Sequence, residues 1–124
     1  MDRKKILIIE DDALLSNMYQ TKFNSEGFCM IVVADGESGI KLLSEGLNPS
    51  MVLLDIVMPK MDGIEVLEKI KQMEICKDVP VIMLTNLGQK ENIDKATKSG
   101  AVGYIVKANY TPSEVVKKVR EIIG

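Results

Sequence analysis

Hydrophobic residues follow two alternating patterns along the chain. Short aliphatic runs bounded by turn residues are typical of β-strands that are covered on both faces. Between these runs, hydrophobic residues recur every three to four positions, which predicts amphipathic helices. The predicted strands are residues 6–9, 30–33, 51–54, 79–84 and 102–106, and the helices between and after them fall within residues 14–23, 40–47, 64–73, 89–99 and 112–123.

Local signals mark the ends of several of these helices. Gly27 is typical of a helix C-terminus. Residues 111–114 have the sequence of a capping box, with Pro112 at the first helical position. The helix within residues 89–99 has few apolar positions, so we expect much of its surface to remain free.

The order of the elements predicts the fold. Strands and helices alternate five times, which indicates one parallel sheet with helices on both faces. The crossovers should be right-handed. The common solution for five such units is an α/β, doubly wound, flavodoxin-like (βα)5 sheet with strand order 2-1-3-4-5. We expect a single domain over residues 1–124, without repeats or linkers.

Composition narrows the functional classes. The chain has 124 residues, of which 46% are hydrophobic and 27% charged, as expected of a globular domain. The net charge of -2 gives no basic field for nucleic acid. No stretch approaches the roughly 20 apolar residues of a membrane span, and the N-terminal apolar run is too short for a signal peptide. We therefore expect a cytoplasmic protein whose two cysteines, Cys29 and Cys76, are free thiols.

Polar side chains follow four of the predicted strands. Asp11 and Asp12 follow the first strand, Asp55 the third, Thr85 the fourth and Lys107 the fifth. Each has an ordinary explanation: either acidic residue after the first strand can cap a helix, Thr85 can cap a turn and Lys107 can reach solvent. In the predicted strand order, however, all of these strand ends open on the same edge of the sheet, where ligands bind in such folds.

The residue types at this edge indicate a chemistry. Clustered carboxylates repel one another unless a cation lies among them, and oxygen ligands suit Mg²⁺ or Mn²⁺. A carboxylate can attack phosphorus to form an aspartyl phosphate, and phosphoryl transfer needs mainly positioning and charge neutralisation. Lys107 would neutralise one phosphoryl oxygen and the hydroxyl of Thr85 would donate to another.

Four motifs resemble the receiver domain of two-component response regulators, and the resemblance covers the whole chain. They are Glu10-Asp11-Asp12, Leu54-Asp55-Ile-Val-Met-Pro59-Lys-Met-Asp62-Gly63, Thr85, and Tyr104-x-x-Lys107. The resemblance implies that Asp55 accepts a phosphoryl group from a histidine kinase or a histidine phosphotransfer protein. It implies a phosphoacceptor with self-catalysed transfer, as opposed to an enzyme with an external substrate.

The resemblance also implies a role for individual residues. Asp12 and Asp55 would be metal ligands, with Asp11 assisting through water and the backbone carbonyl of Val57 completing the protein ligands. Lys107 would be the partner of the phosphoryl group.

Thr85 and Tyr104 would form a switch pair, in which Thr85 moves toward the phosphoryl oxygen and Tyr104 fills the vacated space. The output surface would comprise the helix within residues 89–99, the strand 102–106 and the last helix. It would control an unknown output protein, without nucleic-acid or membrane contact by this domain.

The sequence departs from the family pattern in three places. Ala108 follows Lys107, where the family usually has Pro joined by a cis peptide, so the geometry of this peptide bond stays open. Asn86 replaces a usual Ala or Gly after the switch Thr. Val57 and Leu87 are apolar at positions that border the hydrolytic water, which predicts slow self-dephosphorylation.

Three alternatives stay open from sequence. A phosphatase of the haloacid dehalogenase class would carry Asp-x-Asp on its nucleophile strand, but Val57 stands two residues after Asp55. A flavodoxin-like cofactor carrier would have a phosphate-binding loop after the first strand, where this chain is acidic. A receiver-like binding module that is never phosphorylated is compatible with Asn86 and Ala108. The chain ends after the last helix and is either a stand-alone receiver, which its Met start and Gly124 end slightly favour, or a fragment of a longer regulator.

Overall fold

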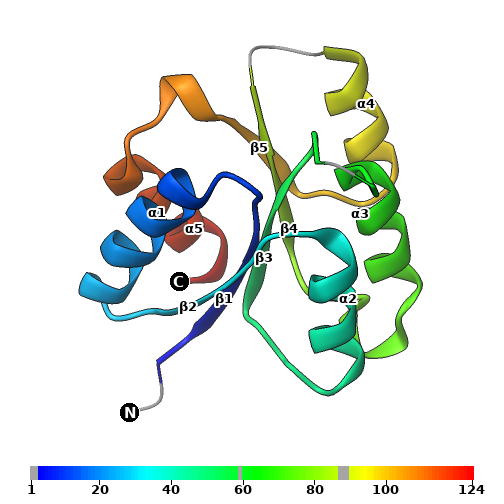
Figure 1. Ribbon diagram of the computed structural model, residues 1–124, viewed down its shortest axis with the longest axis horizontal. Helices are drawn as coiled ribbons and strands as arrows, with labels where there is room; N and C mark the ends of the chain where they lie inside the picture. Colours follow the sequence, from blue (N-terminus) through cyan, green and yellow to red (C-terminus); the bar gives the residue numbers. More distant parts are fainter. Residues whose placement is uncertain (1–2, 59, 87–89) are drawn as a thin grey trace.

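The computed structural model describes residues 3–58, 60–86 and 90–124. Five strands alternate with five α-helices, as the hydrophobic pattern predicts (Figure 1). The strands are β1 (Lys5–Ile9), β2 (Cys29–Val33), β3 (Met51–Asp55), β4 (Val81–Thr85) and β5 (Gly103–Val106). The helices are α1 (Ala13–Ser25), α2 (Gly36–Ser44), α3 (Gly63–Gln72), α4 (Lys90–Lys98) and α5 (Pro112–Ile123), with two 3₁₀ turns, η1 (Glu74–Cys76) and η2 (Lys107–Asn109).

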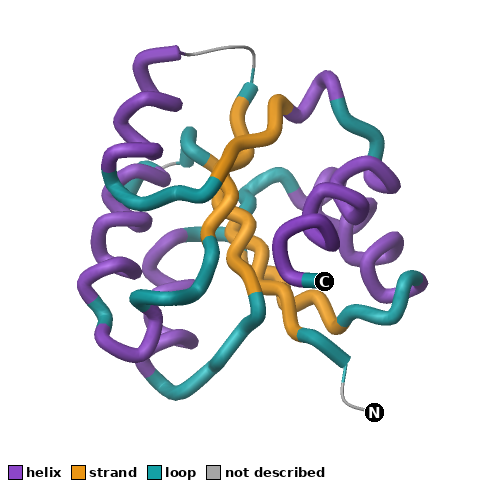
Figure 2. The backbone as a smooth tube through the Cα atoms, turned by 180° about the vertical axis from the view of Figure 1, so that it is seen from behind, coloured by secondary structure: helices purple, strands orange, loops and turns teal. Residues whose placement is uncertain are grey.

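The strands form one parallel sheet in the order β2-β1-β3-β4-β5, which confirms the predicted topology. Helices α1 and α5 cover one face and helices α2, α3 and α4 cover the other, so the molecule has three layers (Figures 1 and 2). Because the strands are parallel, their carboxyl ends meet along one edge, at the top of the sheet in Figure 1.

Successive strand side chains pack into two separate cores. Leu7 and Ile9 of β1 pack with α2, α3 and α4, whereas Ile6 and Ile8 pack with α1 and α5. The same alternation runs through the other strands, as expected for side chains that point to opposite faces of a sheet. Burial on both faces explains why the strands are continuous aliphatic runs.

The helix ends follow the expected local chemistry. Asp12 caps α1, where its side chain accepts a hydrogen bond from the Leu15 N–H at 3.1 Å. Thr111 and Glu114 form the predicted capping box of α5. Gly27, just after α1, has a φ of 95°, a conformation that glycine adopts without strain.

The helical stripe of α1 differs from the prediction in which residues it buries. Leu14 and Met18 are hydrophobic residues at helical spacing but are 74% and 47% exposed, whereas Ser16, Tyr19 and Phe23 are buried. The spacing of three to four residues is kept, but the buried face is rotated so that it includes the polar residue Ser16. Hydrophobicity alone therefore does not identify the buried face of α1.

Smaller differences occur elsewhere. β4 begins at Val81, later than predicted, because Pro80 has no N–H and contributes only its carbonyl, which accepts from the Val52 N–H at 3.0 Å. Thr85 belongs to the strand, and the turns η1 and η2 were not predicted. The predicted start of the fourth helix, Gln89, lies outside the described residues.

The structure also bears on the cysteines and on membrane-spanning helices. Cys29 and Cys76 are free cysteines. Within residues 3–58, 60–86 and 90–124, no helix is both long enough and apolar enough to span a membrane.

Candidate functional site

Three buried charged side chains meet at the carboxyl edge of the sheet. The Lys107 ammonium lies 2.7 Å from Oε2 of Glu10 and 3.2 Å from Oδ2 of Asp55. Each of the three follows by two positions a strand residue that packs against α1 and α5. The twofold alternation of the strands therefore directs all three side chains to this face of the sheet.

Backbone groups hold the two carboxylates. The N–H of Glu10 donates to the carbonyl of Val33 at 3.1 Å, so the β1–β2 ladder continues one residue beyond the strand. Oε1 of Glu10 accepts from the Asp12 N–H at 3.1 Å. Oδ1 of Asp55 accepts from the Val57 N–H at 3.3 Å. Both carboxylates are thus fixed before any ligand arrives.

Burial and charge act against each other in this triad. Burial raises the pKa of Glu10 to about 7, although its contact with Lys107 works in the opposite direction. Burial also raises the pKa of Asp55, again opposed by Lys107. For Lys107 itself, burial favours loss of the proton, but the contacts with Glu10 and Asp55 outweigh this effect and raise its pKa. Lys107 is therefore held as a cation beside two carboxyl groups.

A second set of oxygen atoms overlaps the triad. Glu10, Asp11 and Asp55 each offer a carboxylate oxygen, and these oxygens lie within 4.8 Å of one another. Asp11 is exposed to solvent, whereas the other two residues are buried. An oxygen-only donor set that is open on one side fits Mg²⁺ or Mn²⁺ and does not resemble a zinc site.

The structure places Asp12 outside the cluster of carboxylate oxygens. This residue was expected to be a direct metal ligand, but its carboxylate caps α1, and Glu10 takes the place beside Asp11 and Asp55. The run of three acidic residues alone does not indicate which side chain faces the edge of the sheet. The alternation of Ile6, Ile8 and Glu10 along the strand is the signal that identifies Glu10.

Thr85 and Tyr104 lie on the neighbouring strands β4 and β5. Within the described residues, neither side chain makes a hydrogen bond to Glu10, Asp55 or Lys107. Thr85 is buried, and its hydroxyl donates to the carbonyl of Asn86 at 2.6 Å. Tyr104 is 44% exposed on β5. This arrangement leaves the switch roles of both residues as predictions.

The described positions at which the sequence departs from the family pattern lie around the site. The Lys107–Ala108 peptide is trans, since no cis bond occurs in the described residues. The Val57 side chain is 56% exposed, and Asn86 is exposed as well. The role predicted for the Val57 carbonyl stays a prediction. Pro59 and Leu87 lie outside the described residues.

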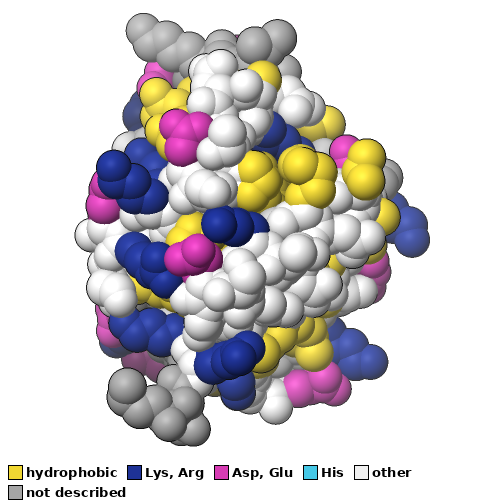
Figure 3. Space-filling view, turned by 90° about the vertical axis from the view of Figure 1, so that its left-hand side faces the viewer, with side chains coloured by type: hydrophobic (Ala, Val, Ile, Leu, Met, Phe, Trp, Pro, Cys, Tyr) yellow, Lys and Arg dark blue, Asp and Glu magenta, His cyan; other side chains and the backbone are white. Residues whose placement is uncertain are grey.

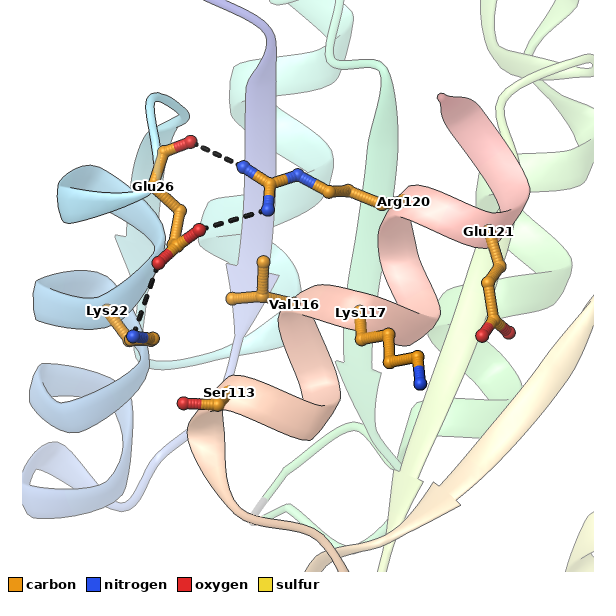
Figure 4. Close-up of a pocket in the computed structure, with 7 residues that line it drawn as sticks. All are labelled: Lys22, Glu26, Ser113, Val116, Lys117, Arg120 and Glu121. Atoms are coloured by element: carbon orange, nitrogen blue, oxygen red, sulfur yellow. Dashed lines mark hydrogen bonds and ion pairs between the residues drawn. The ribbon is translucent and has the colours of Figure 1, made fainter.

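A hollow in the surface lies between α1 and α5, away from the strand ends (Figure 4). Arg120 donates to the Glu26 carboxylate at 3.0 Å and to its backbone carbonyl at 2.7 Å, and Lys22 lies 3.2 Å from the same carboxylate. The dashed lines in Figure 4 show that these charges satisfy one another. On this face of the molecule, charged and hydrophobic side chains are interspersed (Figure 3). The hollow lies away from the strand ends, so it is not part of the candidate site.

Comparisons with known proteins agree with the fold. Residues 6–120 match the family described as response regulator receiver domain. The chain is 36% identical over 118 residues to the DNA-binding response regulator MtrA of Mycobacterium leprae, covering 95% of this chain and 50% of that protein. It is 33% identical over 119 residues to the DNA-binding dual master transcriptional regulator RpaA of Synechocystis sp., covering 96% of this chain and 48% of that protein.

Solved structures give the same result. A CheY-like response regulator receiver domain protein from Methanospirillum hungatei superposes with a TM-score of 0.90 at 28% identity, covering 98% of this chain and 94% of that one. A receiver domain of the sensor histidine kinase PA1611 from Pseudomonas aeruginosa, described with magnesium coordinated in its active site cleft, superposes with a TM-score of 0.88. It is 24% identical and covers 99% of both chains, so the likeness shows the fold alone.

The chain spans about half the length of the curated relatives that it matches. The family match nevertheless spans residues 6–120, a range that contains the carboxyl ends of all five strands. This protein chain therefore belongs to the response regulator receiver domain family.

Proposed function

We propose that this receiver domain accepts a phosphoryl group on Asp55. The observation that carries the proposal is the buried contact of Asp55 with Lys107 beside the three-carboxylate cluster. A buried carboxylate that is paired with a fixed ammonium is a positioned nucleophile, and the ammonium offsets charge that arrives with a phosphoryl group. No ordinary structural role requires these groups to converge at a strand edge.

The reaction follows from the atoms at the site. An oxygen of Asp55 attacks the phosphorus of a phosphohistidine on a histidine kinase or phosphotransfer protein. The new O–P bond forms as the N–P bond breaks, and the electron pair of that bond returns to the imidazole, which takes up a proton. Lys107 turns from Glu10 toward a phosphoryl oxygen and neutralises part of its charge.

The carboxylates of Glu10, Asp11 and Asp55 would hold a divalent cation. Mg²⁺ or Mn²⁺ supplies charge neutralisation for phosphoryl oxygens when it is bound. The short reach among the three oxygens and the exposure of Asp11 support this assignment. The protein's own part is to keep the oxygens together against their mutual repulsion.

The signal would leave through the neighbouring strands. Thr85 would exchange its bond with the Asn86 carbonyl for one with a phosphoryl oxygen, and Tyr104 would then leave the surface for the vacated space. These movements bias the surface of α4, β5 and α5 between two states. The partner bound there is an output protein whose identity the site does not specify.

The test is phosphorylation by acetyl phosphate in the presence of Mg²⁺, read by intact mass. Wild type should gain one phosphoryl group, and Asp55→Asn should gain none. Asp35→Asn is the matched control, because Asp35 caps α2 and Asn serves equally well as a cap. A phosphoryl group on Asp55→Asn would refute the assignment. No added mass on wild type, together with no spectral shift on adding beryllofluoride, would support the alternative of an unphosphorylated binding module.

A further inference from the structure

Tyr19 is a buried polar residue that the proposed reaction does not use. It lies on α1, its side chain is 1% exposed, and its hydroxyl makes no hydrogen bond within the described residues. A buried tyrosine hydroxyl normally has a partner, because an unsatisfied one loses its hydration without compensation. The position of Tyr19 therefore needs an explanation that a phenylalanine would not need.

Tyr19 belongs to the core on the face of the sheet to which the triad side chains are directed. It packs in the same core as Ile8 and Leu53, which precede Glu10 and Asp55 by two positions on their strands. Long helical side chains lean toward the N-terminus of their helix, and α1 begins at the edge of the sheet that carries the triad. The hydroxyl is therefore directed toward these charges.

The surroundings of the hydroxyl agree with this direction. Burial is the main cause that raises the pKa of Tyr19, and the charges that act on it are those of Lys107, Glu10 and Asp55. These are the three members of the triad. The charges of the site therefore act on this hydroxyl, which has no hydrogen-bonding partner within the described residues.

Glu10 also has a buried oxygen without a hydrogen bond within the described residues. In the described part of the chain, the buried side-chain oxygens without a hydrogen bond are Oε2 of Glu10 and the hydroxyl of Tyr19. Oε1 of Glu10 accepts from the Asp12 N–H, whereas Oε2 has only its ion pair with Lys107. When Lys107 turns toward a phosphoryl group, this oxygen loses the ammonium, and even with a cation among the carboxylates one of its lone pairs lacks a donor, which is costly for a buried carboxylate.

We propose that Tyr19 is a positioning residue of the phosphoacceptor site, whose hydroxyl donates to Oε2 of Glu10 when Lys107 leaves it for the phosphoryl group. The inference rests on the proposed function. Tyr19 keeps its proton and touches neither the phosphorus nor the attacking oxygen. Its effect is to stabilise the phosphorylated state, because Glu10 then remains satisfied without the ammonium.

The test compares wild type with Tyr19→Phe, which removes only the hydroxyl. The readout is affinity for beryllofluoride with Mg²⁺, a stable substitute for the phosphoryl group on Asp55, followed by amide NMR shifts. We expect about tenfold weaker binding by Tyr19→Phe, equivalent to about 1.4 kcal/mol. Thermal stability of the free domain should stay equal or rise, because an unpartnered buried hydroxyl has been removed. Tyr110→Phe is the control and should bind as wild type does, because Tyr110 only borders the same core.

A double-mutant cycle shows whether Tyr19 acts through Glu10. In a Glu10→Ala background, Tyr19→Phe should change the affinity less than twofold, because the acceptor is gone. The same tenfold loss in both backgrounds would overturn the inference and indicate a packing effect. Equal affinity of wild type and Tyr19→Phe would overturn it while leaving the proposed function intact. Absence of beryllofluoride binding by wild type would overturn both.

Discussion

Replacing Gly63 by alanine tests how tightly the turn after Asp55 is packed. Gly63 is the first residue of α3, and its N–H donates to the Ile56 carbonyl at 2.7 Å. A Cβ at this position would lie 2.7 Å from the Cα of Ile56 and closer still to the carbonyl oxygen of Asp55. Ordinary contact begins at 3.4 Å, so the strand end that carries the phosphoacceptor would have to move by at least 0.7 Å (3.4 − 2.7).

The expected cost follows from this clash. Overpacking usually costs about 1–3 kcal/mol, and here the opposing atoms are backbone that cannot rotate away, so about 2–3 kcal/mol is expected for Gly63→Ala. With an unfolding entropy of roughly 2.1 cal/mol/K per residue over 124 residues, the midpoint of thermal unfolding should fall by about 8–12 °C. Alanine has the better helix propensity, so any loss arises from the clash.

The assay is thermal and urea unfolding of Gly63→Ala beside Gly103→Ala. Gly103 lies in β5, and a Cβ there would meet nothing within 4 Å, so this variant should unfold within about 0.5 kcal/mol of wild type. Phosphorylation of Gly63→Ala by acetyl phosphate should also slow, because the carbonyl of Asp55 moves with the strand end. If both variants unfolded at the same temperature as wild type, the packing of Gly63 against Asp55 would be refuted.

Two further predictions concern the charged and apolar neighbours of Asp55. Because burial raises the pKa of Glu10 from 4.5 to about 7, the folded state holds this proton more tightly than the unfolded state; the resulting stability is present below pH 4.5 and is lost as the pH rises through 7. Metal-free wild type should therefore lose stability relative to Glu10→Gln between pH 5 and 8 in urea unfolding, and parallel curves would contradict this cause. Val57→Asn should shorten the lifetime of the phosphorylated form severalfold, because an amide can orient water beside Asp55 and an exposed valine cannot. Loss of the phosphoryl group from wild type at least as fast as from Val57→Asn, measured by intact mass over time, would show that the valine does not slow hydrolysis.

The sequence allowed the sheet and its strand order to be predicted because burial on both faces makes each strand a continuous aliphatic run. The positions of Asp55 and Lys107 followed from the same runs, since Asp55 ends one strand and Lys107 directly follows another. A run of three acidic residues does not by itself show which side chain joins the oxygen cluster, and the metal-ligand role of Asp12 stays a prediction. The direction of the Glu10 side chain is set by one additional ladder bond from Glu10 to Val33, which carries the strand alternation of Ile6 and Ile8 on to Glu10.

Tyr19 shows a different limit. In the sequence, Tyr19 is one of several residues at helical spacing that form the apolar side of a helix. What distinguishes it from the others is that its buried hydroxyl has no hydrogen-bonding partner within the described residues. Such a feature depends on every atom around the side chain, so it arises from tertiary packing and has no counterpart in periodicity. The exposure of Leu14 and Met18 has the same origin, because the rotation of α1 about its axis is decided by contacts with the sheet.

The three consecutive acidic residues are similar in charge but not in environment. Glu10 is buried beside an ammonium, Asp11 faces solvent within the oxygen cluster, and Asp12 holds the first turn of α1. A library that permuted acidic and neutral residues over these positions while keeping the total charge would therefore not yield equivalent proteins. Tolerance to substitution in this segment depends on order and side-chain length, so an exchange of Glu10 and Asp11 is not neutral although it keeps the total charge.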